Sequence, residues 1–149
     1  MHEDPYDLQR FVAAQNEVYP AVCAELKGGR KMTHWMWFIF PQIRGLGASP
    51  LSQHFAISCL EEARAYLDHP VLGPRLRDCT RWVQGIEGRT ARQIFGSPDD
   101  LKFRSCLTLF AHASAAETLF EAALGQYYRG EYDPKTVELL GDTPGGASD

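Results

Sequence analysis

Apolar residues recur at helical spacing over most of the chain. Between residues 52 and 67 one stripe follows the spacing of a helix face, with Ala56, Cys59, Leu60, Ala63 and Leu67. A second stripe after Pro70 contains Leu72, Leu76, Cys79 and Val83. Stripes of this kind are typical of amphipathic helices. They predict helices over residues 52–67 and 72–83, and similar patterns predict helices over residues 98–113, 119–127 and 134–140.

Prolines predict where several helices begin. Asp4–Pro5, Ser97–Pro98 and Asp133–Pro134 each place a capping side chain before a proline, which loses no hydrogen bond at the first helical position. We expect Pro20 to separate a first helix over residues 5–16 from a second that ends at Gly28–Gly29, because an interior proline breaks a helix. Thr90 is expected to cap a short turn before Gly96.

Together these elements predict an all-α protein. We expect a single compact multihelical domain of about seven short helices over residues 1–140, followed by a flexible C-terminal tail over residues 141–149. The tail sequence, GDTPGGASD, has the composition of turns and linkers. A chain of 149 residues can build one hydrophobic core without disulfides or metal ions.

Composition limits the classes of function. The chain is 44% hydrophobic with a formal net charge of −4, which argues against disorder and against general binding of duplex DNA. The acidic N-terminus does not resemble a signal peptide and no apolar run approaches a membrane span, so we expect a cytoplasmic protein. The cysteines lack a CxxC pair and the histidines lack HxxxH or HExxH, which predicts reduced thiols, no metal site and no cofactor.

The charge is unevenly distributed along the chain. Residues 26–104 carry twelve basic and seven acidic side chains, a net charge of +5, whereas residues 1–25 and 105–149 carry net charges of −4 and −5. Either the acidic ends fold back and neutralise the middle, or the middle forms a basic pocket for a phosphorylated small molecule or a nucleotide. Eleven of the fifteen basic side chains are arginines, whose planar guanidinium suits phosphate.

One segment, HWMWFIFPQIRGLGASPLS at residues 34–52, departs from the helical pattern. Six consecutive apolar residues, four of them aromatic, run from Trp35 to Phe40. A lone strand is unstable, so we expect a short central helix or an extended plug that supplies much of the core. The glycines that follow form a loop ahead of a helix that should begin between Ser49 and Ser52.

This glycine loop, residues 42–50, is a candidate anion site, because backbone N–H groups before a helix bind anions. It lacks the GK[ST] ending of a Walker loop and the third glycine of a dinucleotide motif, and an ordinary capped turn would explain the same residues. Lys102 and Ser105, on one face of the helix from Pro98, would complete a pocket. The candidate ligand-binding residues are His34, Trp35, Trp37, Gln42, Gly45, Gly47, Ser49, Ser52, Lys102 and Ser105.

Within this set, the aromatic and titratable side chains have distinct expected roles. Trp35 and Trp37 are candidates to stack on a base or sugar. His34 is a candidate general acid or base, or else an ordinary residue at the edge of the core. No Ser–His–Asp or Cys–His arrangement indicates nucleophilic catalysis, so the sequence leaves open whether the protein is an enzyme.

Several of these segments resemble a known family. The stretches DPYDLQRFVAAQ, HWMWFIFPQIRGLGASPLSQHFAI, HPVLGPRL and IFGSPDDLKFRSCLTLF are similar to the family catalogued as domain of unknown function 1810, and the likeness covers roughly residues 4–140. The resemblance implies a small bacterial or fungal protein with a multihelical fold, and it implies no activity. By motif position, the surface of interest in the family corresponds to the ten candidate residues named above.

Two functional hypotheses follow. The first is a cytoplasmic small-molecule-binding protein with a pocket for a phosphorylated or nucleotide-like ligand, with hydrolysis left open. The alternative is a non-enzymatic interaction domain, such as a homodimer, that uses an exposed aromatic patch. The first expects buried tryptophans beneath a cleft in which residues 34–52 face Lys102 and Ser105. The second expects aromatic side chains of residues 34–40 at the surface.

Overall fold

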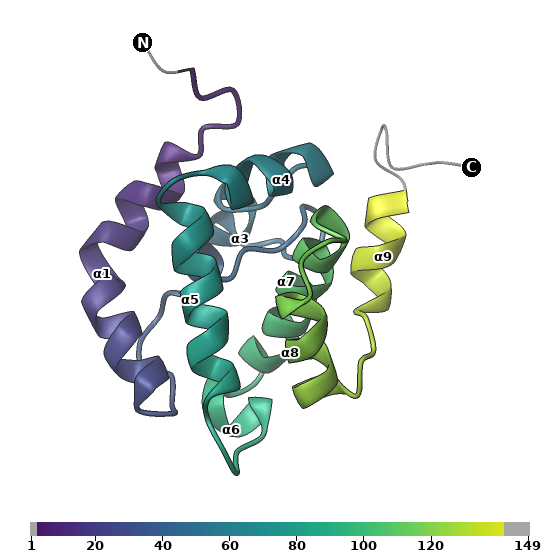
Figure 1. The fold of residues 1–149 in the computed structure, drawn as a ribbon. Helices are drawn as coiled ribbons and strands as arrows, with labels where there is room; N and C mark the ends of the chain where they lie inside the picture. Colours follow the sequence, from purple (N-terminus) through teal and green to yellow (C-terminus); the bar gives the residue numbers. More distant parts are fainter. Residues whose placement is uncertain (1–2, 142–149) are drawn as a thin grey trace.

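Nine helices make up the described part of the chain, residues 3–141, in a computed structural model (Figure 1). They are α1 Gln9–Lys27, α2 Met36–Ile39, α3 Pro50–His54, α4 Leu60–Asp68, α5 Leu72–Gln84, α6 Ala91–Phe95, α7 Asp99–Ala113, α8 Leu119–Tyr128 and α9 Pro134–Gly141. The all-α class is confirmed, with nine helices rather than about seven. Of the expected tail, Gly141 ends α9 and the remainder lies outside the described residues. No helix in this range has both the length and the apolar character needed to cross a membrane.

Helix α7 lies at the centre of the fold. It packs against α4, α6, α8 and α9, while α5 packs against α1, α4 and α8 (Figure 1). Phe103, Cys106 and Phe110 of α7 are fully buried, and every residue from Ser105 to Ala111 is buried. The helix is therefore enclosed on nearly every side over this stretch. Lys102 and Ser105 therefore stand on the most tightly held element of the molecule.

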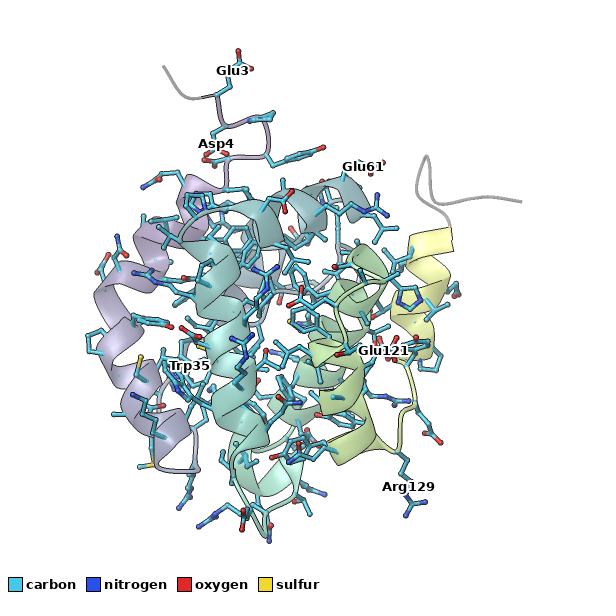
Figure 2. All side chains as sticks on the ribbon, viewed as in Figure 1. Glu3, Asp4, Trp35, Glu61, Glu121 and Arg129 are labelled. Atoms are coloured by element: carbon cyan, nitrogen blue, oxygen red, sulfur yellow. The ribbon has the colours of Figure 1, made fainter. Side chains whose placement is uncertain are left out.

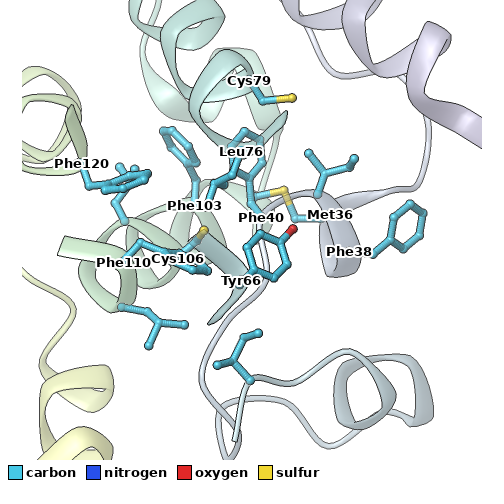
Figure 3. Packing of buried hydrophobic residues seen from close by; sticks show 14 of the residues in the cluster. Met36, Phe38, Phe40, Tyr66, Leu76, Cys79, Phe103, Cys106, Phe110 and Phe120 are labelled. Atoms are coloured by element: carbon cyan, nitrogen blue, oxygen red, sulfur yellow. The ribbon is translucent and has the colours of Figure 1, made fainter. Parts of the chain in front are cut away.

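Of the two forms expected for the aromatic segment, the structure shows the short central helix and not the extended plug. Helix α2 is a single turn, and Met36, Phe38 and Phe40 enter the core beside Tyr66 and Phe103 (Figure 3). The ring centroids of Phe40 and Phe103 are 4.8 Å apart at an interplanar angle of 73°, a favourable edge-to-face arrangement. Each large side chain buried here contributes about 1.5–3 kcal/mol to stability.

The predicted helix starts are confirmed only in part. Thr90 caps α6 through a complete capping box, and α9 begins at Pro134 as expected. Helix α1 begins at Gln9 rather than Pro5, because the Asp4 carboxylate accepts hydrogen bonds from N–H groups four and five residues later. Helix α7 begins at Asp99 without a side-chain cap. The proline signal therefore locates a turn more reliably than it locates the first helical residue.

The expected break at Pro20 is wrong. Helix α1 is nineteen residues long, and Pro20 lies inside it. A proline inside a helix leaves the carbonyl four residues earlier without its donor, and here that carbonyl belongs to Asn16. Both Asn16 and Pro20 are exposed, so water can satisfy the carbonyl. Burial of Phe11, Val22 and Leu26 on the opposite side then holds both halves of the helix against the core.

The expected continuous helix over residues 52–67 is also wrong. It is divided into α3 and α4 by an extended stretch at residues 56–58, where Ile57 forms a parallel bridge with Ile43. The Ile57 N–H donates to the Gln42 carbonyl at 2.9 Å, and the Arg44 N–H donates to the Ile57 carbonyl at 2.8 Å. These bonds replace the helical ones at this position. They also tie the glycine loop to the segment that leads into α4.

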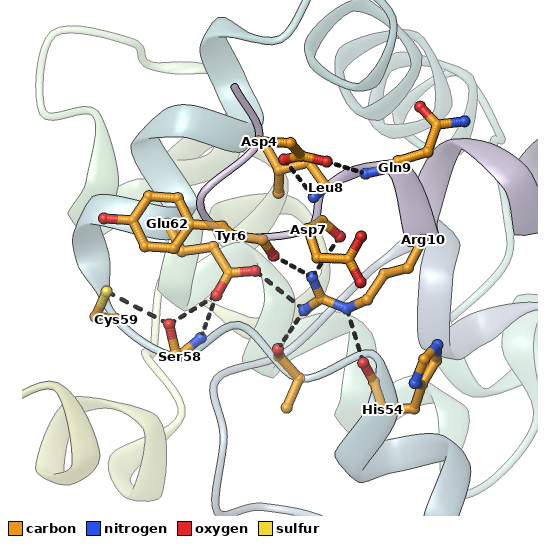
Figure 4. Close-up of polar contacts among 11 residues, drawn as sticks. Asp4, Tyr6, Asp7, Leu8, Gln9, Arg10, His54, Ser58, Cys59 and Glu62 are labelled. Carbon is orange, nitrogen blue, oxygen red and sulfur yellow. Dashed lines mark hydrogen bonds and ion pairs between the residues drawn. The ribbon is translucent and has the colours of Figure 1, made fainter. Parts of the chain in front are cut away.

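Arg10 fastens this same stretch to the N-terminal segment (Figure 4). Its guanidinium donates to the backbone carbonyls of Tyr6, Asp7, His54 and Ala56 and to the carboxylate of Glu62, at distances of 2.6–3.0 Å. The other Glu62 oxygen accepts from the N–H and hydroxyl groups of Ser58. Glu62 is 2% exposed, so its charge is stable only because all these bonds are made.

A second carboxylate, that of Glu25, holds the start of the aromatic segment. It accepts hydrogen bonds from the Met32 and Thr33 N–H groups, the Thr33 hydroxyl and the Trp35 indole N–H, at 2.7–3.0 Å. Burial raises the pKa of Glu25, but these hydrogen bonds outweigh it and leave the pKa below the ordinary value of 4.5. The turn after α1 is therefore stabilised by an ionised carboxylate.

Replacing Glu62 with alanine should lower the free energy of unfolding by about 3–5 kcal/mol, because it leaves the Arg10 charge without its carboxylate. Urea denaturation measures the loss. The matched control is Glu138→Ala, which removes an exposed ion pair with Lys135 at 3.5 Å and should cost less than about 1 kcal/mol. Equal losses in the two variants would show that the Arg10 network does not stabilise the fold.

The contribution of Glu25 should depend on pH. Because its folded-state pKa is depressed, its ionised form stabilises the protein above pH 4.5, and this stabilisation is lost as the pH falls through the folded-state pKa. The difference in unfolding free energy between the native chain and Glu25→Gln should therefore be largest near neutral pH and shrink below pH 4.5. Glu17→Gln, at an exposed position on the same helix, is the control. A difference that stays constant during acid titration would contradict the assignment.

Candidate functional site

The glycine loop leaves the core at Pro41 and turns sharply before α3. Gly45 has a φ of +107°, a conformation that side chains rarely adopt, and a Cβ at this position would also press on Leu139 of α9 at 3.3 Å. A Cβ at Gly47 would meet the Ser52 side chain at 2.6 Å. The Ser49 hydroxyl accepts from the Ser52 N–H at 3.1 Å and caps α3, as predicted. The backbone conformation therefore favours glycine at position 45, and close packing favours it at position 47.

The loop faces the N-terminal half of α7 across a hollow of about 200 Å³. We call this the loop–α7 hollow, and it is lined by Gln42, Leu46, Gly47, Ser52, Pro98, Leu101, Lys102, Ser105 and Asp133. The structure thus brings five of the ten predicted residues to one place: Gln42, Gly47, Ser52, Lys102 and Ser105. Polar groups lie beside the apolar side chains of Leu46 and Leu101, so the lining is amphipathic.

Lys102 supplies the positive charge of the loop–α7 hollow. Its ammonium lies 3.5 Å from Oδ1 of Asp99, whose Oδ2 lies 2.9 Å from the ammonium of Lys31. One carboxylate is therefore shared by two cations, and the closer contact belongs to Lys31. The Lys102 side chain is 27% exposed, and its ammonium is 5.7 Å from the Trp37 ring centroid. This cluster of three charges retains one positive charge at the edge of the hollow.

Asp133 supplies a negative charge that sequence reasoning did not assign to the site. Its Oδ2 accepts from the Ser105 hydroxyl and the Thr136 N–H, each at 3.1 Å, and from the Thr136 hydroxyl. Its own N–H donates to the Thr108 hydroxyl at 2.9 Å. Asp133 was recognisable only as the residue before a helix-starting proline. Through Asp133, the Ser105 hydroxyl of α7 holds the start of α9 against α7.

A second, smaller hollow also borders the glycine loop. It measures about 30 Å³, enough for roughly one water molecule, and we call it the Trp37 hollow. Its lining includes the predicted residues Trp37, Gln42, Gly45, Gly47 and Ser52, together with Arg44 and Gln53. The two hollows share Gln42, Leu46, Gly47 and Ser52, so the loop forms a common wall between them.

Three predicted residues do not line either hollow. Trp35 is completely buried, and its indole N–H donates to Glu25. A ligand therefore cannot stack on Trp35, contrary to the expectation from the sequence. The run of apolar neighbours around Trp35 indicated this burial. His34 is exposed on the turn before α2, and no interaction places it near Lys102. Ser49 acts as the cap of α3.

The groups around the loop–α7 hollow offer a cation, a carboxylate and hydrogen-bonding side chains, but they do not include a nucleophile paired with a histidine base. Its titratable groups are Lys102 and Asp133, and no histidine is part of the lining. Burial raises the pKa of Cys79 to about 12 and that of Cys106 well above its usual value, which leaves both thiols unreactive. Within residues 3–141, no group of three or more His, Cys, Asp or Glu side chains is arranged to hold a metal ion.

Comparison with known proteins connects this geometry to a family. A family model described as "Protein of unknown function (DUF1810)" matches residues 5–140. The chain is also similar to a solved structure, the crystal structure of the conserved hypothetical protein Rv1873 from Mycobacterium tuberculosis. Sequence identity is 56%, the match covers 94% of this chain and 100% of that one, and the TM-score is 0.92. No curated protein matches the chain. The resemblance predicted from four motifs is thereby confirmed, and the chain belongs to the DUF1810 family.

Proposed function

We propose that this protein binds a small phosphorylated molecule, such as a sugar phosphate or a nucleotide, in the loop–α7 hollow. The observation that carries the proposal is the shared carboxylate of Asp99. Because Lys31 approaches Asp99 more closely than Lys102 does, the charge of Lys102 is only partly compensated. The Lys102 side chain is 27% exposed, and a charge partly removed from water attracts a phosphate more strongly than a fully exposed lysine would.

The opposite wall favours a ligand that also carries hydroxyl groups. The hydrogen bonds that Asp133 accepts from Ser105 and Thr136 end on its Oδ2. Its Oδ1 can therefore accept from a donor on the ligand, and Gln42 and Ser52 offer further polar groups. A free phosphate ion would gain little from a neighbouring carboxylate. A sugar phosphate would place its phosphate at Lys102 and its hydroxyl groups at Asp133.

Burial of the aromatic segment favours this proposal over the alternative of an interaction domain. That alternative needs aromatic side chains of residues 34–40 at the surface. Trp35 and Phe40 are completely buried and Phe38 is 9% exposed, whereas Trp37 is half-buried beside Lys102. Trp37 thus borders the candidate site instead of forming an exposed patch. The lining carries no paired nucleophile and base, so we propose binding as the function and assign no reaction to it.

A panel of nucleotides and sugar phosphates should reveal the ligand through thermal unfolding. A ligand present at 100 times its dissociation constant stabilises the folded state by about 2.7 kcal/mol. For a domain of this length, that corresponds to a rise in the unfolding midpoint of roughly 5–10 °C. A panel in which no phosphorylated compound raises the midpoint would overturn the proposal.

Variants at the loop–α7 hollow test whether a ligand that raises the unfolding midpoint binds there. Lys102→Gln should weaken binding by roughly 10- to 100-fold, the value of a hydrogen bond to a charged group. Leu101→Glu places a negative charge at the rim, at a side chain 56% exposed, and should also weaken binding without unfolding the protein. Leu51→Glu changes a leucine 46% exposed that does not line the hollow, and it should bind normally. Equal weakening of ligand binding by Leu101→Glu and Leu51→Glu would show that the ligand binds outside the loop–α7 hollow.

A further inference from the structure

The fold neutralises the basic middle of the chain only in part. Two of its arginines, Arg77 and Arg104, pair with Glu117 and Glu131 of the acidic C-terminal segment. The N-terminal segment and α9 end at the opposite side of the molecule from α6 (Figure 1). Glu3, Asp4 and Glu61 lie at that acidic side, and nitrogen-tipped side chains project around α6 (Figure 2). Some of the cations of the middle segment thus lie at the end of the molecule opposite these acidic side chains. The loop–α7 hollow uses only Lys102 of the basic segment, so this basic end is independent of the function proposed above.

The basic end contains a hollow of its own, of about 440 Å³, where the ends of α1 and α5 meet. It is lined by Lys27, Gly28, Gly29, Arg81, Trp82, Gly85, Ile86, Glu87 and Arg89. A Cβ on Gly29 would lie 3.6 Å from Nε of Arg89, so the turn after α1 lies directly beside the loop before α6. A hydrogen bond of 2.7 Å from the Lys31 N–H to the Ile94 carbonyl fixes this arrangement.

Cations outnumber anions at this end. Exposed Arg30 and Arg92 stand on the two segments that the Lys31–Ile94 bond joins, and with Lys27, Arg81 and Arg89 they make up what we call the basic pole. Among the described residues, Arg81 contacts Asp78 at 3.5 Å through two exposed side chains, a weak pair, and no ion pair is formed by the other four. Glu87 is the one acidic side chain of the lining.

The helix ends explain only part of this charge. Lys27 and Arg81 occupy the last turns of α1 and α5, where a cation offsets the helix dipole. Arg30 and Arg89 lie in turns outside any helix, where no such effect favours a cation. Like charges gathered at one end of the molecule repel one another, and an anionic partner would relieve this repulsion.

An aromatic side chain stands among these cations. Trp82 is half-buried in the wall of the hollow, with the Lys27 ammonium over its ring at 4.7 Å from the centroid and the Tyr19 ring centroid 6.4 Å away. A base that takes the place of Lys27 over this ring would stack on it, while the displaced ammonium and the other cations hold the phosphates. Insertion into a lipid surface would instead require the ring to project from the protein, and this ring is recessed.

We propose that the basic pole binds single-stranded nucleic acid. Its five cations exceed what one phosphate group can use, which favours a chain of phosphates over a mononucleotide. The recessed Trp82 requires an unstacked base, which a single strand offers and a duplex does not. The chain as a whole carries a net charge of −4, so repulsion orients the protein with its acidic side away from the strand.

Fluorescence anisotropy with a labelled RNA of about 12 nucleotides in roughly 50 mM salt tests the proposal. Lys27→Gln combined with Arg89→Gln should weaken binding at least about tenfold and should reduce the slope of log K against log salt by about 1.4, the value for two lost phosphate contacts on a single strand. Trp82→Leu should weaken binding at least about fivefold through loss of base stacking.

The control carries the same change of charge at another place. Arg129→Gln combined with Lys135→Gln removes two exposed cations outside the basic pole and outside the hollows of the glycine loop, and should bind RNA as the native chain does. Circular dichroism establishes that every variant is folded. Absence of RNA binding by the native chain, equal weakening by both double variants, stronger binding to duplex DNA, or binding confined to vesicles of anionic lipid would each overturn the proposal. Loss of binding in Lys102→Gln would place the RNA in the loop–α7 hollow and would also overturn it.

Discussion

One guanidinium, that of Arg10, connects the parts of the chain that build the candidate site. It binds the Ala56 carbonyl, and the next residue, Ile57, pairs with both Gln42 and Arg44 of the glycine loop. The position of the loop is therefore coupled to α1 through three consecutive polar contacts. A charge this deeply buried is stable only with all its partners in place, so the network admits one arrangement of these segments. Apolar packing alone tolerates small shifts and would specify the loop less well.

The opposite wall of the site is held in a different way. Lys102 and Ser105 project from α7, whose inner residues are fully buried, and Asp133 fixes the start of α9 to the same helix. Leu139 of α9 then packs close to Gly45 of the loop. The glycine loop thus lies against α7 and α9, whose positions are set by core packing and by the Ser105–Asp133 bond. This explains how a segment with two glycines can keep a defined hollow open instead of collapsing into it.

The sequence predicted what depends on local patterns and missed what depends on distant partners. The stripe Leu72, Leu76, Cys79 and Val83 is a buried helix face, and the aromatic run became a buried turn. The apolar stripe over residues 52–67 failed because Ile57 finds its hydrogen bonds on residues 42–44, which no local pattern records. Lys102 was expected to face Gln42 and Ser52, and Asp133 was expected to cap the last helix, which it does through the Thr136 N–H. The bonds of the Trp35 indole to Glu25 and of the Ser105 hydroxyl to Asp133 join residues ten or more positions apart, and no motif in the sequence records them.

The two basic sites differ in the physics that supports them. The Lys102 side chain is mostly buried, and Asp99, which it shares with Lys31, compensates only part of its charge. Salt therefore screens its attraction for a bound phosphate less than it screens that of a fully exposed cation. The basic pole is exposed, and its attraction for a polyanion extends over about a Debye length and falls steeply with salt. A shielded single cation suits recognition of one small molecule, because desolvation penalises any ligand without a matching anion. An exposed group of cations suits a long flexible chain, which can satisfy several charges in many arrangements. The same net-acidic molecule thus places a selective cation and a permissive cluster of cations on different elements.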